Sequence, residues 1–199
     1  MFKLNTLVRP NIVKLAAYSS ARDEFKGEAE VFLDANENPF GDLNRYPDPN
    51  QSKVKKKLSE IKQVEIDQVF IGNGSDEVID LAFRIFCEPG IDKALIFSPT
   101  YGMYDVSASI NHTQLLKIPL NDHFEIDINR LSRYFNDKNL KLIFICSPNN
   151  PTGNCFDKTS IEFILKNFKG IVVIDEAYID FSSQESYLTK LESFPNLIV

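Results

Sequence analysis

Residues 140–178 read LKLIFICSPNNPTGNCFDKTSIEFILKNFKGIVVIDEAY. In this stretch the apolar run Leu140–Cys146 ends in a turn with two prolines. A segment with helical spacing, Ile161–Phe168, then leads to a second apolar run, Ile171–Ile174. Strands that are apolar throughout are typical of sheets covered on both faces, and helical crossovers between such strands make the sheet parallel. The stretch therefore predicts a β–α–β unit of a parallel α/β sheet.

The same alternation of short apolar runs and helical spacing continues on both sides of this unit. Further strands are expected at residues 31–33, 68–71, 93–97, 115–118 and 197–199, and further helices at residues 54–61, 78–86, 101–110 and 128–135. We therefore predict a three-layer α/β/α fold around a mainly parallel sheet. Residues 1–35 are expected to form an N-terminal arm. Residues 36–199 are expected to form an incomplete large domain, because the alternation stops on an apolar run.

The composition is that of an ordinary soluble globular protein, with 43% hydrophobic and 25% charged residues among 199. The net charge is −6, and the basic cluster of Lys53 and residues 55–57 has the pattern of a solvated helix face. No apolar stretch approaches the ~18 residues of a membrane span. We therefore expect a cytoplasmic protein with neither a nucleic acid nor a membrane as partner.

The cysteines and histidines predict neither a disulfide scaffold nor a metal site. Cys87 and Cys146 lie in apolar runs, as reduced core thiols do, and Cys155 makes the count odd. His112 and His123 are the only histidines, and their spacing is not that of metal ligands. A metalloenzyme is therefore not expected.

Four groups of chemically capable residues fall at the predicted exits of strands. They are residues 72–77 (GNGSDE), 98–104 (SPTYGMY), 146–153 (CSPNNPTG) and 175–178 (DEAY). In an open parallel sheet, ligands bind beyond the carboxyl ends of the strands. We therefore expect these four groups to line one concavity.

The first group turns through glycines into a helix, so that free backbone amides and the positive end of the helix face outward. That arrangement suits a phosphate group. An ordinary tight turn with Ser75 as the N-cap is the alternative for this segment alone. A dinucleotide fingerprint, as in a nicotinamide-dependent dehydrogenase, is disfavoured because its third glycine would fall at Glu77.

The other three groups each have a ligand-binding and a purely structural interpretation. The aromatic Tyr101 could stack on a planar ligand or pack within its turn, and the amide of Asn150 could hold a ligand hydroxyl or only shape its loop. A carboxylate such as Asp175 at the mouth of an apolar strand needs a cation, for example a protonated heterocyclic nitrogen, unless it caps the next segment. Tyr178 adds a phenolic donor. In this order the four groups match the parts of a pyridoxal-phosphate site.

The phrases SPNNPTG (147–153) and DEAY (175–178) resemble those of the fold-type I pyridoxal-phosphate aminotransferases. The phrases YSSAR (18–22), LDANENPFG (33–41) with NRYPD (44–48), and PTYGMY (99–104) resemble the histidinol-phosphate aminotransferase branch of that family. The resemblance covers nearly the whole chain. It implies the large domain of that fold and amino transfer between L-histidinol phosphate and 2-oxoglutarate in histidine biosynthesis, by a cytoplasmic homodimer.

The resemblance also implies a role for each candidate site residue. Asp175 pairs with the ring nitrogen of the cofactor, and Tyr178 with Asn150 binds its 3′-oxygen, so that Asp175 and Tyr178 are the expected catalytic residues. Gly74, Ser75 and Asp76 are expected to bind the cofactor phosphate, and Tyr101 is expected to stack on the ring. Tyr46 is expected to reach the phosphate of the partner subunit, and Tyr18 and Asn36 are expected to contact the substrate. The Asn150–Pro151 peptide is expected to be cis.

One family feature is missing from residues 1–199. In the family, a strand like residues 196–199 leads into a Thr-x-Ser-Lys segment whose lysine forms the Schiff base, and no lysine here has that context. We therefore expect a truncated portion of the enzyme that is inactive by itself. The alternatives are a pyridoxal-phosphate decarboxylase of a phosphorylated amino acid, an aromatic aminotransferase, a non-catalytic fragment and, from another class, the nicotinamide-dependent dehydrogenase.

Overall fold

The computed structural model describes residues 2–25, 27 and 29–199 of the chain. The chain forms two compact units, of which one comprises Met1–Val13 with Gly72–Val199 and the other Lys14–Ile71. These units divide the chain at other positions than residue 35, and the domain organisation predicted from the sequence stays a prediction. Each unit is described by itself below.

The first unit is built on a five-stranded sheet in which every neighbouring pair of strands is parallel. The strands are β1 (Lys93–Ser98), β2 (Gln114–Pro119), β3 (Leu140–Cys146), β4 (Ile171–Asp175) and β5 (Leu197–Ile198), in the order β2-β1-β3-β4-β5. The central strands form because their residues are apolar on both faces and are buried on both. The predicted parallel sheet is therefore confirmed.

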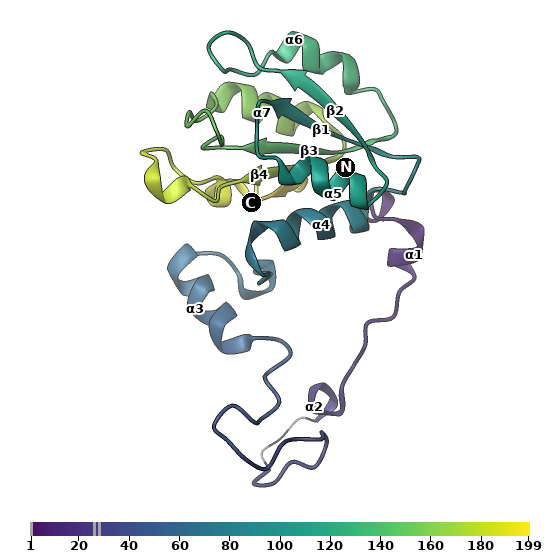
Figure 1. The fold of residues 1–199 in the computed structure, drawn as a ribbon, viewed down its shortest axis with the longest axis vertical. Helices are drawn as coiled ribbons and strands as arrows, with labels where there is room; N and C mark the ends of the chain where they lie inside the picture. The colour runs from purple at the N-terminus through teal and green to yellow at the C-terminus, as the bar shows by residue number, and fades with distance from the viewer. Residues whose placement is uncertain (1, 26, 28) are drawn as a thin grey trace. The chain divides into compact units, whose positions relative to one another are not determined.

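Helices cover both faces of the sheet (Figure 1). The four that do so are α4 (Gly74–Phe86), α5 (Met103–Ile110), α6 (Ile128–Leu131) and α7 (Lys158–Asn167). Alternate strand residues separate the two cores, since Phe144 packs with α4 and α5, whereas Ile143 and Ile145 pack with α6 and α7. The three-layer α/β/α fold predicted from the sequence is confirmed.

The bounds of the predicted helices change where local capping decides them. The helix expected from Ile161 begins at Lys158, because the carboxylate of Asp157 accepts a hydrogen bond from the Ser160 amide at 2.9 Å and caps the first turn. The helix expected at 128–135 consists of α6 and a 3₁₀ turn, η3 (Ser132–Tyr134). Two further 3₁₀ turns follow β4, namely η4 (Ile179–Phe181) and η5 (Tyr187–Lys190).

The N-terminal residues of the first unit contact α4 and the segment after it. They contain η1 (Leu4–Thr6) and α1 (Pro10–Val13). The Arg9 amide donates to the Ile85 carbonyl at 2.9 Å, and the Arg9 guanidinium donates to the Glu88 carboxylate at 3.1 Å. Leu7 and Val8 pack against the α4 core. These contacts attach the start of the chain to the sheet unit.

The second unit contains α2 (Ala21–Glu24), α3 (Ser52–Lys62) and η2 (Ile66–Gln68). The strands predicted at residues 31–33 and 68–71 are wrong, because neither segment pairs with another strand in the part of the chain that the structure describes. Leu33 and Phe70 are exposed there. A strand needs a neighbour for its backbone hydrogen bonds, and a short apolar run does not supply one.

Among the described residues, no helix has both the length and the apolar character needed to cross a membrane.

Candidate functional site

Hydrogen bonds join the four predicted groups. Three of them follow β1, β3 and β4, whereas residues 72–77 were wrongly predicted to follow a strand and form the start of α4. The Tyr101 hydroxyl donates to Asp76 Oδ1 at 3.1 Å and connects the loop after β1 with the start of α4. The Tyr104 hydroxyl donates to Asp175 Oδ2 at 2.8 Å and connects α5 with the end of β4. The Ser147 amide donates to the Asp175 carbonyl at 3.0 Å, so the exits of β3 and β4 are also joined. The four groups therefore form one site, as the strand order requires.

The start of α4 presents backbone amides at this site. Helix α4 begins at Gly74, which has a positive φ of 74°, and a Cβ atom added to Gly74 would meet nothing within 4 Å. The N-cap residue is Asn73, without a side-chain cap among the described residues, so the alternative that Ser75 is the N-cap is wrong. The Glu77 carboxylate accepts from the Asn73 amide at 2.6 Å, just before the helix. Open space remains beside Gly74 at the start of this 13-residue helix, and the amides of a helix start suit an anion.

The loop after β3 is held by Asn149, a residue to which the sequence analysis gave no separate role. Asn149 is only 2% exposed, and its side-chain amide donates to the Pro99 carbonyl at 3.0 Å and to Thr152 Oγ1 at 2.7 Å. Its Oδ1 accepts from the Thr100 hydroxyl at 2.8 Å. The sequence feature that could have predicted this role is the pair Asn149-Asn150, in which the first amide holds the loop and the second faces the hollow.

The neighbouring Asn150 faces a hollow of about 540 Å³. Tyr178, Cys155 and Phe181 line the same hollow, together with residues of the loops after β3 and β4. The Asn150–Pro151 peptide is cis, which confirms the prediction, and Ser98–Pro99 and Ser147–Pro148 are cis as well. Asn150 and Tyr178 are thus brought together, as their predicted shared role requires.

The carboxylate of Asp175 is buried and held from both sides. Oδ1 accepts from the Ala177 amide at 3.1 Å, and Oδ2 accepts from the Tyr104 hydroxyl. Tyr104 is fully buried, with its ring stacked on Phe144 at 5.1 Å between centroids. Burial and the negative charge of Asp175 raise the pKa of Tyr104, so this phenol stays protonated and donates. No separate role of Tyr104 was predicted from the sequence, in which it stands in the first turn of α5 and Tyr101 stands before that helix begins.

The ring of Tyr101 lies between the two ends of the site. It meets Tyr104 edge to face, with ring centroids 5.8 Å apart and an interplanar angle of 89°. Its hydrogen bond to Asp76 is the largest of the effects that raise the pKa of Tyr101. Desolvation and the charge of Asp175 raise this pKa further. Tyr101 therefore contacts Asp76 through its hydroxyl and Tyr104 through its ring.

Three predicted site residues belong to the second unit, and their place near the site stays a prediction. Tyr18, Asn36 and Tyr46 are all exposed within that unit. The Glu37 carboxylate accepts from the Tyr46 amide at 2.9 Å and also binds Arg45 Nη1. The phrases at 33–41 and 44–48 are thus in contact with each other.

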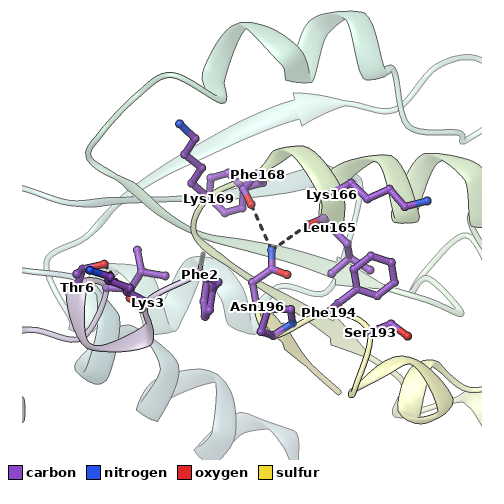
Figure 2. Close-up of a pocket in the computed structure, with 12 residues that line it drawn as sticks. Phe2, Lys3, Thr6, Leu165, Lys166, Phe168, Lys169, Ser193, Phe194 and Asn196 are labelled. Atoms are coloured by element: carbon purple, nitrogen blue, oxygen red, sulfur yellow. Dashed lines mark hydrogen bonds between the residues drawn. The ribbon is translucent and has the colours of Figure 1, made fainter.

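A second hollow, of about 600 Å³, lies where the chain enters β4 and β5 (Figure 2). It contains none of the predicted site residues. Asn196 closes one side, with its amide donating to the carbonyls of Leu165 and Phe168, and the side chains of Lys166 and Lys169 extend away from it. The site formed by the four predicted groups lies at the opposite, carboxyl ends of the strands.

A family model described as aminotransferase class I and II matches residues 10–199. The chain belongs to this family. It is 55% identical over 200 residues to the histidinol-phosphate aminotransferase of Parabacteroides distasonis, an alignment that covers 100% of this chain and 58% of that relative. This aminotransferase-family chain thus spans little more than half the length of that relative.

Solved structures of similar fold lead to the same family. The histidinol-phosphate aminotransferase from Clostridium acetobutylicum aligns with a TM-score of 0.68 and 26% identity, over 78% of this chain and 46% of that one. The enzyme from Sinorhizobium meliloti, solved in complex with pyridoxal-5′-phosphate, aligns with a TM-score of 0.66 and 21% identity, over 77% of this chain and 42% of that one. The latter likeness concerns the fold alone. The sheet and helices of this aminotransferase-family chain are those of fold-type I.

Proposed function

We propose that the complete protein is a pyridoxal-phosphate-dependent aminotransferase that moves an amino group between L-histidinol phosphate and 2-oxoglutarate in histidine biosynthesis. The observation that carries the proposal is the buried carboxylate of Asp175 at the exit of β4, three residues before Tyr178 in the hollow. A buried carboxylate is stabilised by a cation, and the protonated ring nitrogen of the cofactor is one. The name of the relative that is 55% identical supports the choice of substrate.

The residues at the strand exits fit this cofactor in their chemistry. The uncapped start of α4 beside Gly74 offers amides for a phosphate, and the hollow offers the Asn150 amide and the Tyr178 hydroxyl for a ring oxygen. The Asp76 carboxylate is engaged by the Tyr101 hydroxyl. We assign the phosphate to Gly74, Ser75 and Asp76, the ring face to Tyr101, the 3′-oxygen to Asn150 and Tyr178, and the ring nitrogen to Asp175.

Each of these residues then has a defined task. When bound, pyridoxal phosphate supplies a ring that takes up the electron pair released at the substrate α-carbon. Asp175, as an anion, keeps a proton on the ring nitrogen, and this proton makes the ring a better electron acceptor. Tyr178 and Asn150 hold the 3′-oxygen and so fix the rotation of the ring in its plane. Asp175 and Tyr178 are therefore the proposed catalytic residues of this chain.

We further propose that the protein is a homodimer in the cytoplasm. In the second unit, Leu33, Phe40 and Leu43 have exposed fractions of 91%, 79% and 100%, and exposed apolar side chains of this size mark protein interfaces. Tyr46 of one copy would reach the phosphate site of the other, and Tyr18 and Asn36 would contact the substrate. The three cysteines are free thiols, in keeping with a reducing compartment.

The test is amino transfer by the complete gene product. The protein is incubated with pyridoxal phosphate, histidinol phosphate and 2-oxoglutarate, and glutamate is quantified by mass spectrometry. We expect one glutamate for each histidinol phosphate consumed. Phosphothreonine and phenylalanine are the comparison substrates. Release of carbon dioxide from phosphothreonine without glutamate would indicate a decarboxylase, and faster transfer from phenylalanine an aromatic aminotransferase. Sedimentation at micromolar concentration tests the dimer.

A further inference from the structure

The hydroxyl of Tyr104 is buried beside a carboxylate that the proposed function uses. Tyr104 has no exposed surface, and its hydroxyl donates to Asp175 Oδ2 at 2.8 Å. The Cys146 thiol, which lies nearby, donates instead to the Pro148 carbonyl at 3.3 Å. Asp175 is thus the acceptor that satisfies this phenol, and a buried hydroxyl without an acceptor would destabilise the fold.

Packing explains the ring of Tyr104 but not its hydroxyl. The ring is stacked on Phe144 with an interplanar angle of 27° and meets Tyr101 edge to face. A phenylalanine would fill the same volume and make both ring contacts. The hydroxyl adds the hydrogen bond to Asp175 and a weaker interaction with the Cys146 thiol, and Asp175 is the charged partner of the two.

Two donors from different elements restrict the orientation of the Asp175 carboxylate. The Ala177 amide, on the chain just after β4, binds Oδ1, and the Tyr104 hydroxyl, on α5, binds Oδ2. The Ala177 amide lies two residues away in the chain and resists a turn of the carboxylate about its Cβ–Cγ bond by one hydrogen bond only. The second donor, the Tyr104 hydroxyl, is held in place because its ring is packed in the core between α5 and the sheet. The packing of this core therefore sets the plane of the Asp175 carboxylate.

We propose that Tyr104 is a positioning residue that sets the orientation in which Asp175 meets the ring nitrogen of the cofactor. The inference rests on the proposed function, because it assumes that Asp175 faces that nitrogen. Tyr104 itself touches neither cofactor nor substrate in this scheme. It acts through Asp175, and its hydroxyl matters only for ligands that carry the ring nitrogen.

The test compares two ligands that differ at one ring atom. The first is pyridoxamine 5′-phosphate, which binds without a Schiff base, and the second is its 1-deaza analogue, in which a C–H group replaces the ring nitrogen. Dissociation constants of both are measured by calorimetry for the complete protein, as the unchanged chain and with Tyr104→Phe, Asp175→Asn, both of these changes together, or Tyr187→Phe. Tyr187 is the matched control, because its buried hydroxyl has no partner among the described residues.

We expect Tyr104→Phe to weaken binding of pyridoxamine 5′-phosphate about tenfold, the size typical of one hydrogen bond to a charged group, and to leave the deaza analogue unchanged. The loss should disappear in the Asp175→Asn background. Tyr187→Phe should bind both ligands as the unchanged chain does. Melting curves identify any unfolded variant, and the deaza analogue is the internal reference for the folded fraction.

Two further outcomes separate the positioning role from the proposed function. If Tyr104→Phe weakens both ligands equally, or neither, the positioning role is overturned while the proposed function stands. If the unchanged complete protein binds the deaza analogue as tightly as pyridoxamine 5′-phosphate, the assignment of Asp175 to the ring nitrogen fails, and the positioning role fails with it.

Discussion

Asp175 is the residue on which the proposed chemistry depends most. In the complete protein, Asp175→Asn should lower the rate of amino transfer on the order of a thousandfold, since one lost charge interaction in a buried site raises the barrier by several kcal/mol. The two side chains are isosteric, but the amide keeps only one of the two acceptor oxygens that bind the Ala177 amide and the Tyr104 hydroxyl, so the melting temperature should fall and the rates are compared on folded protein. Glutamate formation measures the rate, and Asp122→Asn, at an exposed loop position, is the control for the change of charge. Near-normal turnover of Asp175→Asn would show that Asp175 only caps the segment after β4 and takes no part in the reaction.

The three thiols should differ sharply in reactivity. Burial raises the pKa of Cys87 to about 12, with a further contribution from the charge of Asp92, and burial also raises the pKa of Cys146. Both thiols therefore stay protonated at pH 8, whereas Cys155 is only partly buried. Iodoacetamide followed by mass spectrometry should label Cys155 first in the folded chain and all three in urea. Equal labelling in the folded chain would contradict the packing of the core on the α4 and α5 side of the sheet, which contains both buried thiols.

At the residue scale, the sequence identified groups with recognisable chemistry but not the partners that hold them. Asp175 could be predicted because a carboxylate after an apolar run is unusual. Tyr104 could not, because a tyrosine on a helix face has the same pattern whether its hydroxyl reaches solvent or a carboxylate. The hydrogen bond depends on how α5 is rotated against β4, and the rotation is set by the whole core.

At the scale of single elements, the loop after β3 depends on Asn149. Asn149→Ala removes three side-chain hydrogen bonds and leaves the Pro99 carbonyl without this donor, so the free energy of unfolding should fall by about 2–3 kcal/mol. Urea unfolding measures the change. Asn150→Ala is the matched control, expected to alter stability by less than about 1 kcal/mol while weakening cofactor binding. The prediction fails if the two variants are equally stable.

The start of β1 is joined to the turn before β3 by an ion pair that should depend on pH. Lys93 Nζ lies 2.8 Å from Asp137 Oδ2. This hydrogen bond is the largest of the effects that lower the pKa of Asp137 from its ordinary value of 3.8. A carboxyl pKa lowered by folding stabilises the fold above the unfolded pKa, and the contribution is lost as pH falls through the folded value. Asp137→Asn should therefore cost at most about 1 kcal/mol at pH 7, because solvent screens the pair.

The pH dependence is the diagnostic part of that comparison. The stability gap between Asp137→Asn and the unchanged chain should be constant near neutrality, should begin to narrow below about pH 4, and should close as pH falls through the folded pKa of Asp137. Urea titrations at pH 7, 5 and 3.5 measure it. A gap that persists at low pH would show that the effect comes from the hydrogen bond to the Asn139 amide rather than from charge.

The elements that could be predicted are those whose burial is visible in the chain itself. Strands β1, β3 and β4 are apolar on both faces, so their runs stand out, and the parallel sheet follows from them. The runs at 31–33 and 68–71 are equally apolar but form no strand in the described structure. Three or four residues cannot reveal whether a neighbouring strand exists, because the pairing is a property of the fold.

At the scale of the whole molecule, the strand order has a consequence for synthesis. Strand β2 joins one side of β1, and β3, β4 and β5 then follow one another on the other side, so no strand has to enter between two that are already paired. A chain emerging from the ribosome can extend an existing edge at each step. We expect chains arrested after residues 120, 147 and 176 to show stepwise amide protection in pulse-labelled hydrogen exchange. Protection that appears in all strands at once would instead indicate that the sheet forms only after release.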